Sequence, residues 1–332
     1  MKRLLFVIIA AAALYAGYWF VGSNGATAGF ERWFEDRRTE GWVADVESIE
    51  TRGFPSRFDT TLTGISLADP DTGVAYFAPF LQIFALSYKP EHLIAVWPKE
   101  QSVSSPFGKA EITSDDMRAS LIVKKNTSLA LEKANYTTDA VTLQMDNGET
   151  FGTAKASMAI ELIPAAQNAY HFGVNLKDVL LPEPRGIRLE AGILPKTLEF
   201  ARVDVTAAFD APWDLNALQS ARPQPKRITV KLIEAKWGQL ELRLAGAFDV
   251  DTTGRATGQI TIKAQNWRDI LAVSAATGAI PTQLVRPFEQ GLSLLSGLSG
   301  NRNTLDLPLT LDQGQMKLGP IPIGPAPLFR LR

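Results

Sequence analysis

The sequence predicts a mainly β protein of the α+β class. An N-terminal transmembrane helix is expected to precede one or more large curved antiparallel sheets, with a few C-terminal helices packed on them. Three observations support this: an uncharged apolar run over residues 4–21, strand-like alternation from residue 42 to about 209, and helical spacing of apolar residues over 266–300. Because long helical segments do not alternate with the strands, a parallel sheet of βαβ units is not expected.

The composition is that of a globular chain. It has 332 residues, of which 45% are apolar and 21% charged, with a net charge of -1. We expect one continuous β-rich body over residues 42–332, because no low-complexity linker divides it. The lack of excess Lys and Arg argues against a nucleic-acid partner. The lack of cysteine excludes disulfides and thiolate metal sites.

Residues 1–23 have the features of a membrane anchor. Lys2 and Arg3 precede eighteen uncharged residues, LLFVIIAAAALYAGYWFV, which as a helix would span ~27 Å. The charges predict a cytoplasmic N-terminus and a single pass through the bacterial inner membrane, with the body in the periplasm. Trp19 is expected in the aromatic belt at the far end. The alternative is a signal peptide cleaved near Ala28, but the apolar run is longer than a signal peptide usually has.

Residues 24–41 predict an amphipathic juxtamembrane helix. Phe30, Trp33, Phe34 and Arg37 recur at helical spacing, and charged residues occupy the positions between them. Two interpretations are open: the apolar stripe lies on the bilayer surface, or it packs on the folded body as a lid. With Trp19, the three aromatic residues form the predicted membrane-proximal set.

The segment FDVDTTGRATGQITIKAQNW, residues 248–267, begins like a calcium-binding loop, with Asp249, Asp251 and Thr253 at alternate positions. Such a loop needs a bidentate Glu at its twelfth position, which here is Ile260. Period-two alternation on both sides instead predicts an antiparallel hairpin.

Helices are predicted at three further places. A short one is expected within residues 211–220, before the prolines that follow. A second is expected to be capped by Asn266 and ended by Gly278. A third has Leu284, Phe288, Leu292 and Leu295 at helical spacing, with Pro281 in its first turn and Pro287 either kinking it or marking its start.

Catalytic signatures are missing from the sequence. Its two histidines, His92 and His171, match no metal-binding spacing, and no nucleophile elbow or phosphate-binding loop is found. We therefore predict no catalytic residue, no metal, no cofactor and a function other than catalysis.

Aromatic residues crowd one stretch: Tyr76, Phe77, Phe80, Phe84 and Tyr88. Core packing is the default interpretation of each of them. Taken together, they are the candidate lining of an apolar groove for lipid on a curved sheet.

Two sets of residues resemble known envelope proteins. Gly246, Asp251, Gly254, Gly258 and Asn266 resemble the hairpin-then-helix segment of AsmA-like proteins. Residues 53–59 and 307–327 resemble the alphaproteobacterial domain-of-unknown-function family 2125, in which a membrane helix precedes a β-rich periplasmic body.

The resemblance implies a membrane-anchored envelope protein without catalytic residues, which handles phospholipid along a β groove. It implies no catalytic activity. The alternative is a structural or scaffolding protein with a closed core, whose protein partners the sequence does not identify.

Overall fold

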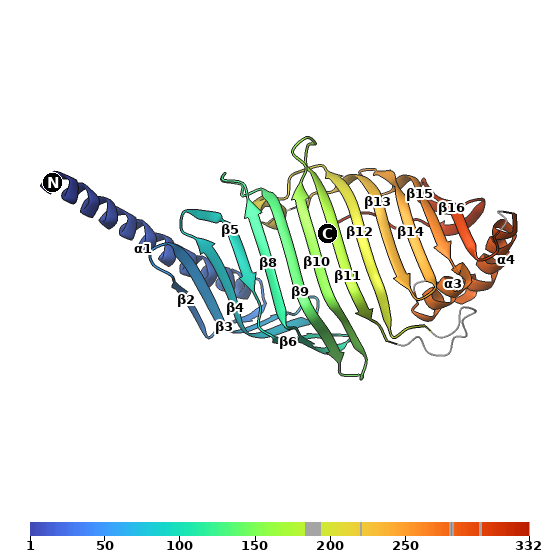
Figure 1. Cartoon of the computed structure of the whole chain (residues 1–332), viewed down its shortest axis with the longest axis horizontal. Coiled ribbons are helices and arrows are strands. Elements are labelled where there is room, and N and C mark those ends of the chain that lie inside the picture. The colour runs from blue at the N-terminus through green and yellow to red at the C-terminus, as the bar shows by residue number, and fades with distance from the viewer. Residues whose placement is uncertain (183–193, 220, 279, 281, 299–300, 332) are drawn as a thin grey trace. The chain divides into compact units, whose positions relative to one another are not determined.

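The computed structural model describes residues 1–182, 194–219, 221–278, 280, 282–298 and 301–331. Eighteen strands and four helices are found in these ranges, and every strand pairing within the two compact units of the chain is antiparallel (Figure 1). The predicted fold class is therefore confirmed. Unit 1 comprises residues 1–125 and 132–150, and unit 2 comprises residues 126–131 and 151–332, so the predicted body is divided between the two.

Unit 1 begins with α1 (Lys2–Thr39), a single continuous helix that contains both the predicted anchor and the predicted juxtamembrane segment. It is long and apolar enough to cross a membrane. No proline interrupts it, and it ends before Gly41, whose φ of +92° is accessible to glycine at little cost.

The sheet of unit 1 is built around two long strands, β3 (Arg57–Asp69) and β4 (Val74–Leu86), which pair with each other along their length. β3 also pairs with β1 (Val43–Asp45) and β2 (Ser48–Arg52). β4 also pairs with two strands, β5 and β6. The remaining elements are β5 (Lys89–Val96), β6 (Glu100–Ser105), β7 (Gly108–Thr113), β8 (Asp116–Val123) and β9 (Leu131–Met145).

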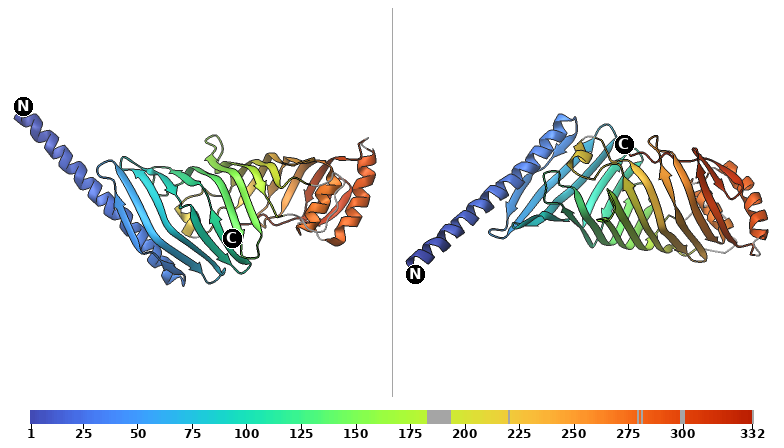
Figure 2. Two further views of the ribbon diagram at one scale, coloured as in Figure 1. Left: turned by 60° about the horizontal axis from the view of Figure 1, so that its bottom comes forward. Right: turned by 90° about the horizontal axis from the view of Figure 1, so that it is seen from above.

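Unit 2 is a meander in which each strand pairs with the next along the chain (Figure 2). Its strands are β10 (Thr150–Leu162), β11 (Ala169–Leu180), β12 (Thr197–Phe209), β13 (Pro225–Trp237), β14 (Leu240–Val250), β15 (Ala256–Gln265), β16 (Thr304–Asp312), β17 (Gln315–Leu318) and β18 (Ile321–Pro325). Its helices are α2 (Leu215–Gln219), α3 (Trp267–Ala276) and α4 (Thr282–Leu298). The short helix expected within residues 211–220 is α2.

The predicted hairpin is confirmed as β14 and β15, whose register runs from Glu241 opposite Gln265 to Val250 opposite Ala256. Asp251 closes its turn, because its Oδ1 accepts hydrogen bonds from the Thr253 hydroxyl (2.7 Å) and the Arg255 backbone N–H (3.0 Å). These bonds lower the pKa of the Asp251 carboxyl. The aspartate that suggested a calcium loop therefore stabilises a turn.

The C-terminal helices pack on the sheet of unit 2, as predicted. Trp267 and Leu271 of α3 and Leu292 of α4 form a buried cluster with Ala264 and Leu305 of the sheet. The apolar contacts in this cluster hold α3 and α4 against β15 and β16.

The expected helix ends are partly corrected. α3 does begin after Asn266 and stop before Gly278, but the Asn266 side chain forms no cap. Its backbone is left-handed, with φ of +54°, and its Nδ2 donates to the Gln239 carbonyl at 2.7 Å. Pro287 lies inside α4 and does not mark its start. Pro281 lies outside the described residues.

Candidate functional site

An apolar face covers one side of unit 2. From β10 to β16, cross-strand partners form four adjacent rows in which every member is an apolar residue or glycine. The rows run from Leu162 to Leu311, from Ile160 to Leu309, from Met158 to Leu307 and from Ala156 to Leu305. The third row comprises Met158, Val174, Val203, Ile233, Leu244, Ile262 and Leu307. Partners in an antiparallel pair project to the same side, so these rows form one surface.

A register shift between Val230 and Ile233 keeps the apolar side chains of β13 on the same side of the sheet as those of β12 and β14. Strict alternation from Val230 would place Glu234 on the apolar face. The extra residue of the bulge brings Ile233 to this face instead and turns Glu234 to the other side, where Arg243 lies 2.8 Å from its carboxylate.

The opposite side of the same strands is charged. His171 bonds Asp204 at 2.8 Å, Arg202 lies 4.0 Å from Glu234, and Lys263 pairs with Asp306 at 3.0 Å. Glu234 is 12% exposed, whereas the other five side chains are 36–62% exposed, so the His171–Asp204 and Lys263–Asp306 pairs contribute little stability. The sheet of unit 2 is thus apolar on one side and solvated on the other.

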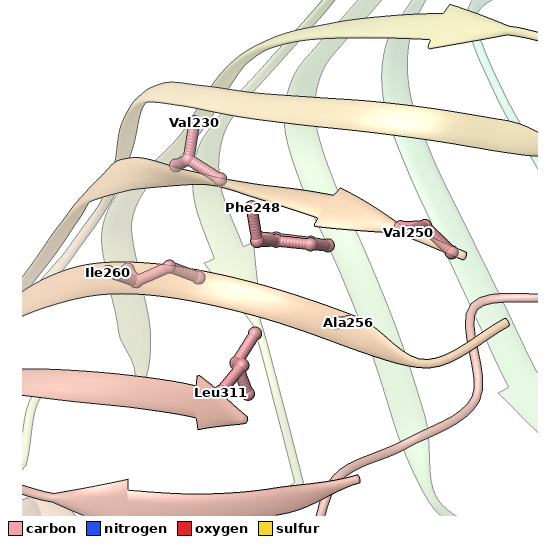
Figure 3. Close-up of a cluster of buried hydrophobic side chains, with 6 residues drawn as sticks. All are labelled: Val230, Phe248, Val250, Ala256, Ile260 and Leu311. Carbon is pink, nitrogen blue, oxygen red and sulfur yellow. The ribbon is translucent and has the colours of Figure 1, made fainter. Parts of the chain in front are cut away.

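The chain itself covers part of the first and second rows. Figure 3 shows Val230, Phe248, Ile260 and Leu311 projecting from neighbouring strands towards a shared cluster. The C-terminal tail adds Phe329, whose ring centroid lies 4.8 Å from that of Phe248. The Phe329 backbone N–H donates to the Gly254 carbonyl at 2.8 Å.

The third row is less well covered. Met158 is 45% exposed and the other six members are only half-buried, although their neighbours on the sheet are all apolar. Seven strands at a spacing of ~4.8 Å make this row about 29 Å long. Among the described residues of the four rows, only Tyr170 carries a hydrogen-bonding group on its side chain, and its hydroxyl donates to the Leu131 carbonyl.

The aromatic residues predicted to line a groove are divided between sites in unit 1. Tyr76 faces α1, in the cluster that contains Phe34 and Leu62. Burial raises the pKa of Tyr76 to about 12, and its hydroxyl donates to Gln101 Oε1 at 2.7 Å. The 50% exposed ring of Phe77, its neighbour, lies on the opposite face of β4.

The other three candidates are also separate from Tyr76. Phe80 and Phe84 alternate with Leu81 and Ile83, which join the α1-facing cluster, so both phenylalanines face away from it. The Arg57 guanidinium lies 5.5 Å from the Phe84 ring centroid. Tyr88 lies in the turn after β4 and is 60% exposed. The five residues do not line one common groove.

An apolar cavity of about 450 Å³ lies between α1 and the sheet of unit 1. Gly25, Ala26 and Gly29 line it from the helix, and Leu62, Leu67 and Tyr76 line it from the strands. The small helix residues leave the space open. Of the five predicted groove residues, only Tyr76 lines this cavity.

The predicted membrane-proximal residues mostly contact protein. Trp19 is 6% exposed, and its indole Nε1 donates to the Arg57 carbonyl at 2.8 Å. Phe30 and Phe34 pack on β1 and β3, while Trp33 is 42% exposed. For Phe30 and Phe34 the structure decides in favour of packing on the body.

The apolar face was not among the sequence predictions. A signal was present, because β14 alternates apolar Leu240, Leu242 and Leu244 with polar residues, and β15 does the same. The sequence does not show the register between neighbouring strands, and this register determines whether their apolar side chains lie on the same side of the sheet.

Comparison with known proteins gives a family. The model of a family described as "Uncharacterized protein conserved in bacteria (DUF2125)" matches residues 19–327. No curated protein and no solved structure matches the chain. Because the family match covers most of the chain and extends through both units, the chain belongs to domain-of-unknown-function family 2125.

Proposed function

We propose that this protein is held in the bacterial inner membrane by α1, with its body in the periplasm, and that it binds lipid acyl chains on the apolar face of unit 2 without catalysis. The observation that carries the proposal is the third row, an apolar strip across seven strands in which Met158 is exposed and the other six members are only partly buried. The likeness to AsmA-like envelope proteins in the β14–β15 hairpin agrees with this role.

Contacts of α1 with the body support an anchor that stays attached. Trp19 donates to the Arg57 carbonyl, and the Thr27 hydroxyl is 2.9 Å from that of Thr51. The helix continues through Ala28 without a break. Cleavage near Ala28 would remove these contacts and leave the ring of Phe58 without part of its packing.

The chemistry of the apolar face favours a linear apolar ligand. Covering apolar surface contributes roughly 25 cal/mol per Å², and an extended acyl chain would cover a long, narrow strip. Ligand sites that orient polar substrates place a few polar groups among apolar ones. Here the charged residues lie on the other side of the sheet, which favours binding over catalysis.

One observation favours a scaffolding protein as the alternative. Phe329 of the C-terminal tail already covers Phe248, so the chain fills part of its own apolar face. If the whole face is filled in this way, the protein would bind partners through another surface.

Site-specific photocrosslinking separates the two functions. Benzoylphenylalanine would replace Met158 in the full-length protein in bacterial cells, and the adducts would be identified by mass spectrometry. The matched control replaces Lys155, which lies on the same strand with its side chain on the opposite, exposed side.

We expect phospholipid adducts at position 158 and none at 155. Protein adducts without lipid at 158 would favour the scaffold. Equal lipid labelling at both positions would mean that lipid surrounds the protein without a site, and would also contradict the proposal.

A further inference from the structure

We infer that two turns of unit 1, residues 53–56 and 87–88, enter the membrane interface beside α1. Their side chains Phe54 and Tyr88 contact phospholipid there. This inference rests on the proposed anchoring by α1. Both turns and α1 belong to unit 1.

Both turns are attached to α1 near the end of its apolar run. The Trp19 ring packs edge-on against Phe54, with centroids 5.4 Å apart, and the Phe20 ring stacks on Phe54 at 5.9 Å. The Tyr15 hydroxyl is 2.8 Å from Ser87 Oγ, and the Tyr18 hydroxyl donates to the Ser87 carbonyl.

Helix length places these contacts at membrane depth. Figure 1 and Figure 2 show the N-terminal part of α1 projecting beyond the strands of unit 1. The part before Tyr15, residues 2–14, would span only about 20 Å at ~1.5 Å per residue. A hydrocarbon core of about 30 Å needs roughly 20 residues, which extends the span to Val21 or beyond. If the span ends at Val21, the turns that contact Tyr15, Tyr18 and Trp19 therefore lie within about 9 Å of the bilayer edge, at ~1.5 Å per residue.

The exposed surface at this level fits a lipid interface. Phe54 is 55% and Tyr88 60% exposed, and the Phe54 ring stacks on that of Phe20, which is itself 57% exposed. Aromatic rings are enriched at the headgroup level of membranes, where an apolar ring meets water at one end. The exposed apolar surface of α1 is thus continuous with that of the first turn, and the second turn is held to α1 through Ser87.

Basic side chains flank both turns. Arg57 follows the first turn and is about half exposed, and Lys89 follows Tyr88 in the second. Long basic side chains can keep an apolar stem near the rings while the charge reaches headgroup phosphates. The partner is therefore a phospholipid surface.

Fluorescent labelling tests this placement. The protein has no cysteine, so a single introduced cysteine is a unique attachment point. Phe54→Cys, Tyr88→Cys and Ser56→Cys would carry an environment-sensitive nitrobenzoxadiazole label in the full chain. Ser56→Cys retains both aromatic residues. It therefore reports the position of the first turn even if the loss of Phe54 or Tyr88 disturbs the packing of the turns on α1. The membrane is a vesicle of phosphatidylethanolamine and phosphatidylglycerol containing spin-labelled lipid as quencher.

Two further positions serve as references. Phe107→Cys lies in the turn between β6 and β7, beside the Val74 end of β4, whereas Tyr88 follows its Leu86 end. Phe107 is 93% exposed, so it reports an aqueous turn of the same unit. Ile8→Cys reports whether α1 is inserted.

We expect several-fold stronger quenching by shallow spin labels at 54, 56 and 88 than at 107, and quenching by deep spin labels at 8. Quenching at 8 with 54, 56 and 88 no different from 107 would overturn the inference while leaving the anchor intact. No quenching at 8 would overturn the anchor and the inference together.

Discussion

Replacing Gly258 by alanine tests the close strand pairing under the apolar face. Gly258 has a φ of +155°, and a Cβ added there would lie 2.4 Å from the Ala247 carbonyl oxygen and 2.5 Å from the Phe248 Cα. β14 and β15 would have to separate by about 1 Å to restore an ordinary contact of 3.4 Å. Both obstacles are backbone atoms, so no side chain can rotate away.

The cost has two parts. The unfavourable φ contributes roughly 1–3 kcal/mol, and the forced overlap contributes roughly 1–3 kcal/mol more. We therefore expect Gly258→Ala to lower the free energy of unfolding of unit 2 by about 2–6 kcal/mol. The measurement is urea unfolding of the full-length protein in mild detergent, followed by far-UV circular dichroism.

Two glycines of unit 2 provide controls. Gly278 has a φ of +75° with nothing within 4 Å of an added Cβ, so Gly278→Ala carries only the conformational cost of about 1–2 kcal/mol. Gly297 lies in α4 with open space around it, so Gly297→Ala should stabilise by up to about 1 kcal/mol. The reasoning fails if Gly258→Ala is no more damaging than Gly278→Ala.

Three further predictions concern the turn, the tail and the cavity. The hydrogen bonds that lower the pKa of Asp251 stabilise the fold above the ordinary carboxyl value of 3.8 and are lost as pH falls through the lowered pKa. Asp251→Ala should therefore reduce the urea midpoint at pH 7 and lose this difference in strong acid; an unchanged difference would contradict the assignment. Phe329→Ala removes an aromatic contact with Phe248 that is worth roughly 0.5–1.5 kcal/mol. The backbone amides of the C-terminal tail should therefore exchange hydrogen for deuterium faster, as measured by mass spectrometry. Unchanged exchange would show that the ring does not hold the tail. Because burial raises the pKa of Tyr76 to about 12, the phenolate absorbance that Tyr76→Phe removes should develop near pH 12, whereas development near pH 10 would mean that the phenol is solvated.

Local patterns in the sequence predicted the elements that depend on neighbours along the chain. The apolar run of residues 4–21 predicts a helix because its length and lack of charge are properties of one segment. Alternation around the Asp251 turn predicts a hairpin for the same reason, since both strands and their turn are contiguous. The end of α3 at Gly278 is equally local.

Contacts between distant residues decided what individual side chains do. Trp19 has the side chain and the sequence position typical of a membrane-interface residue. Its indole N–H nevertheless donates to the backbone carbonyl of Arg57, which is distant in the sequence. Asn266 has the side chain of a helix cap, yet it bonds Gln239 across the sheet. Alternation along β4 places Tyr76 and Phe77 on opposite faces, but only the packing of Tyr76 against α1 shows which of the two faces is covered.

The sequence by itself determined that this is a β-rich chain with one N-terminal apolar helix and alternating strands, because periodicity and turn chemistry act over a few residues. Only the tertiary structure decided that the apolar sides of seven strands form one face. That face depends on strand register, and a slip of one residue turns every side chain to the other side. In β13 the bulge between Val230 and Ile233 keeps Glu234 off the apolar face, and its position is set by both neighbouring strands.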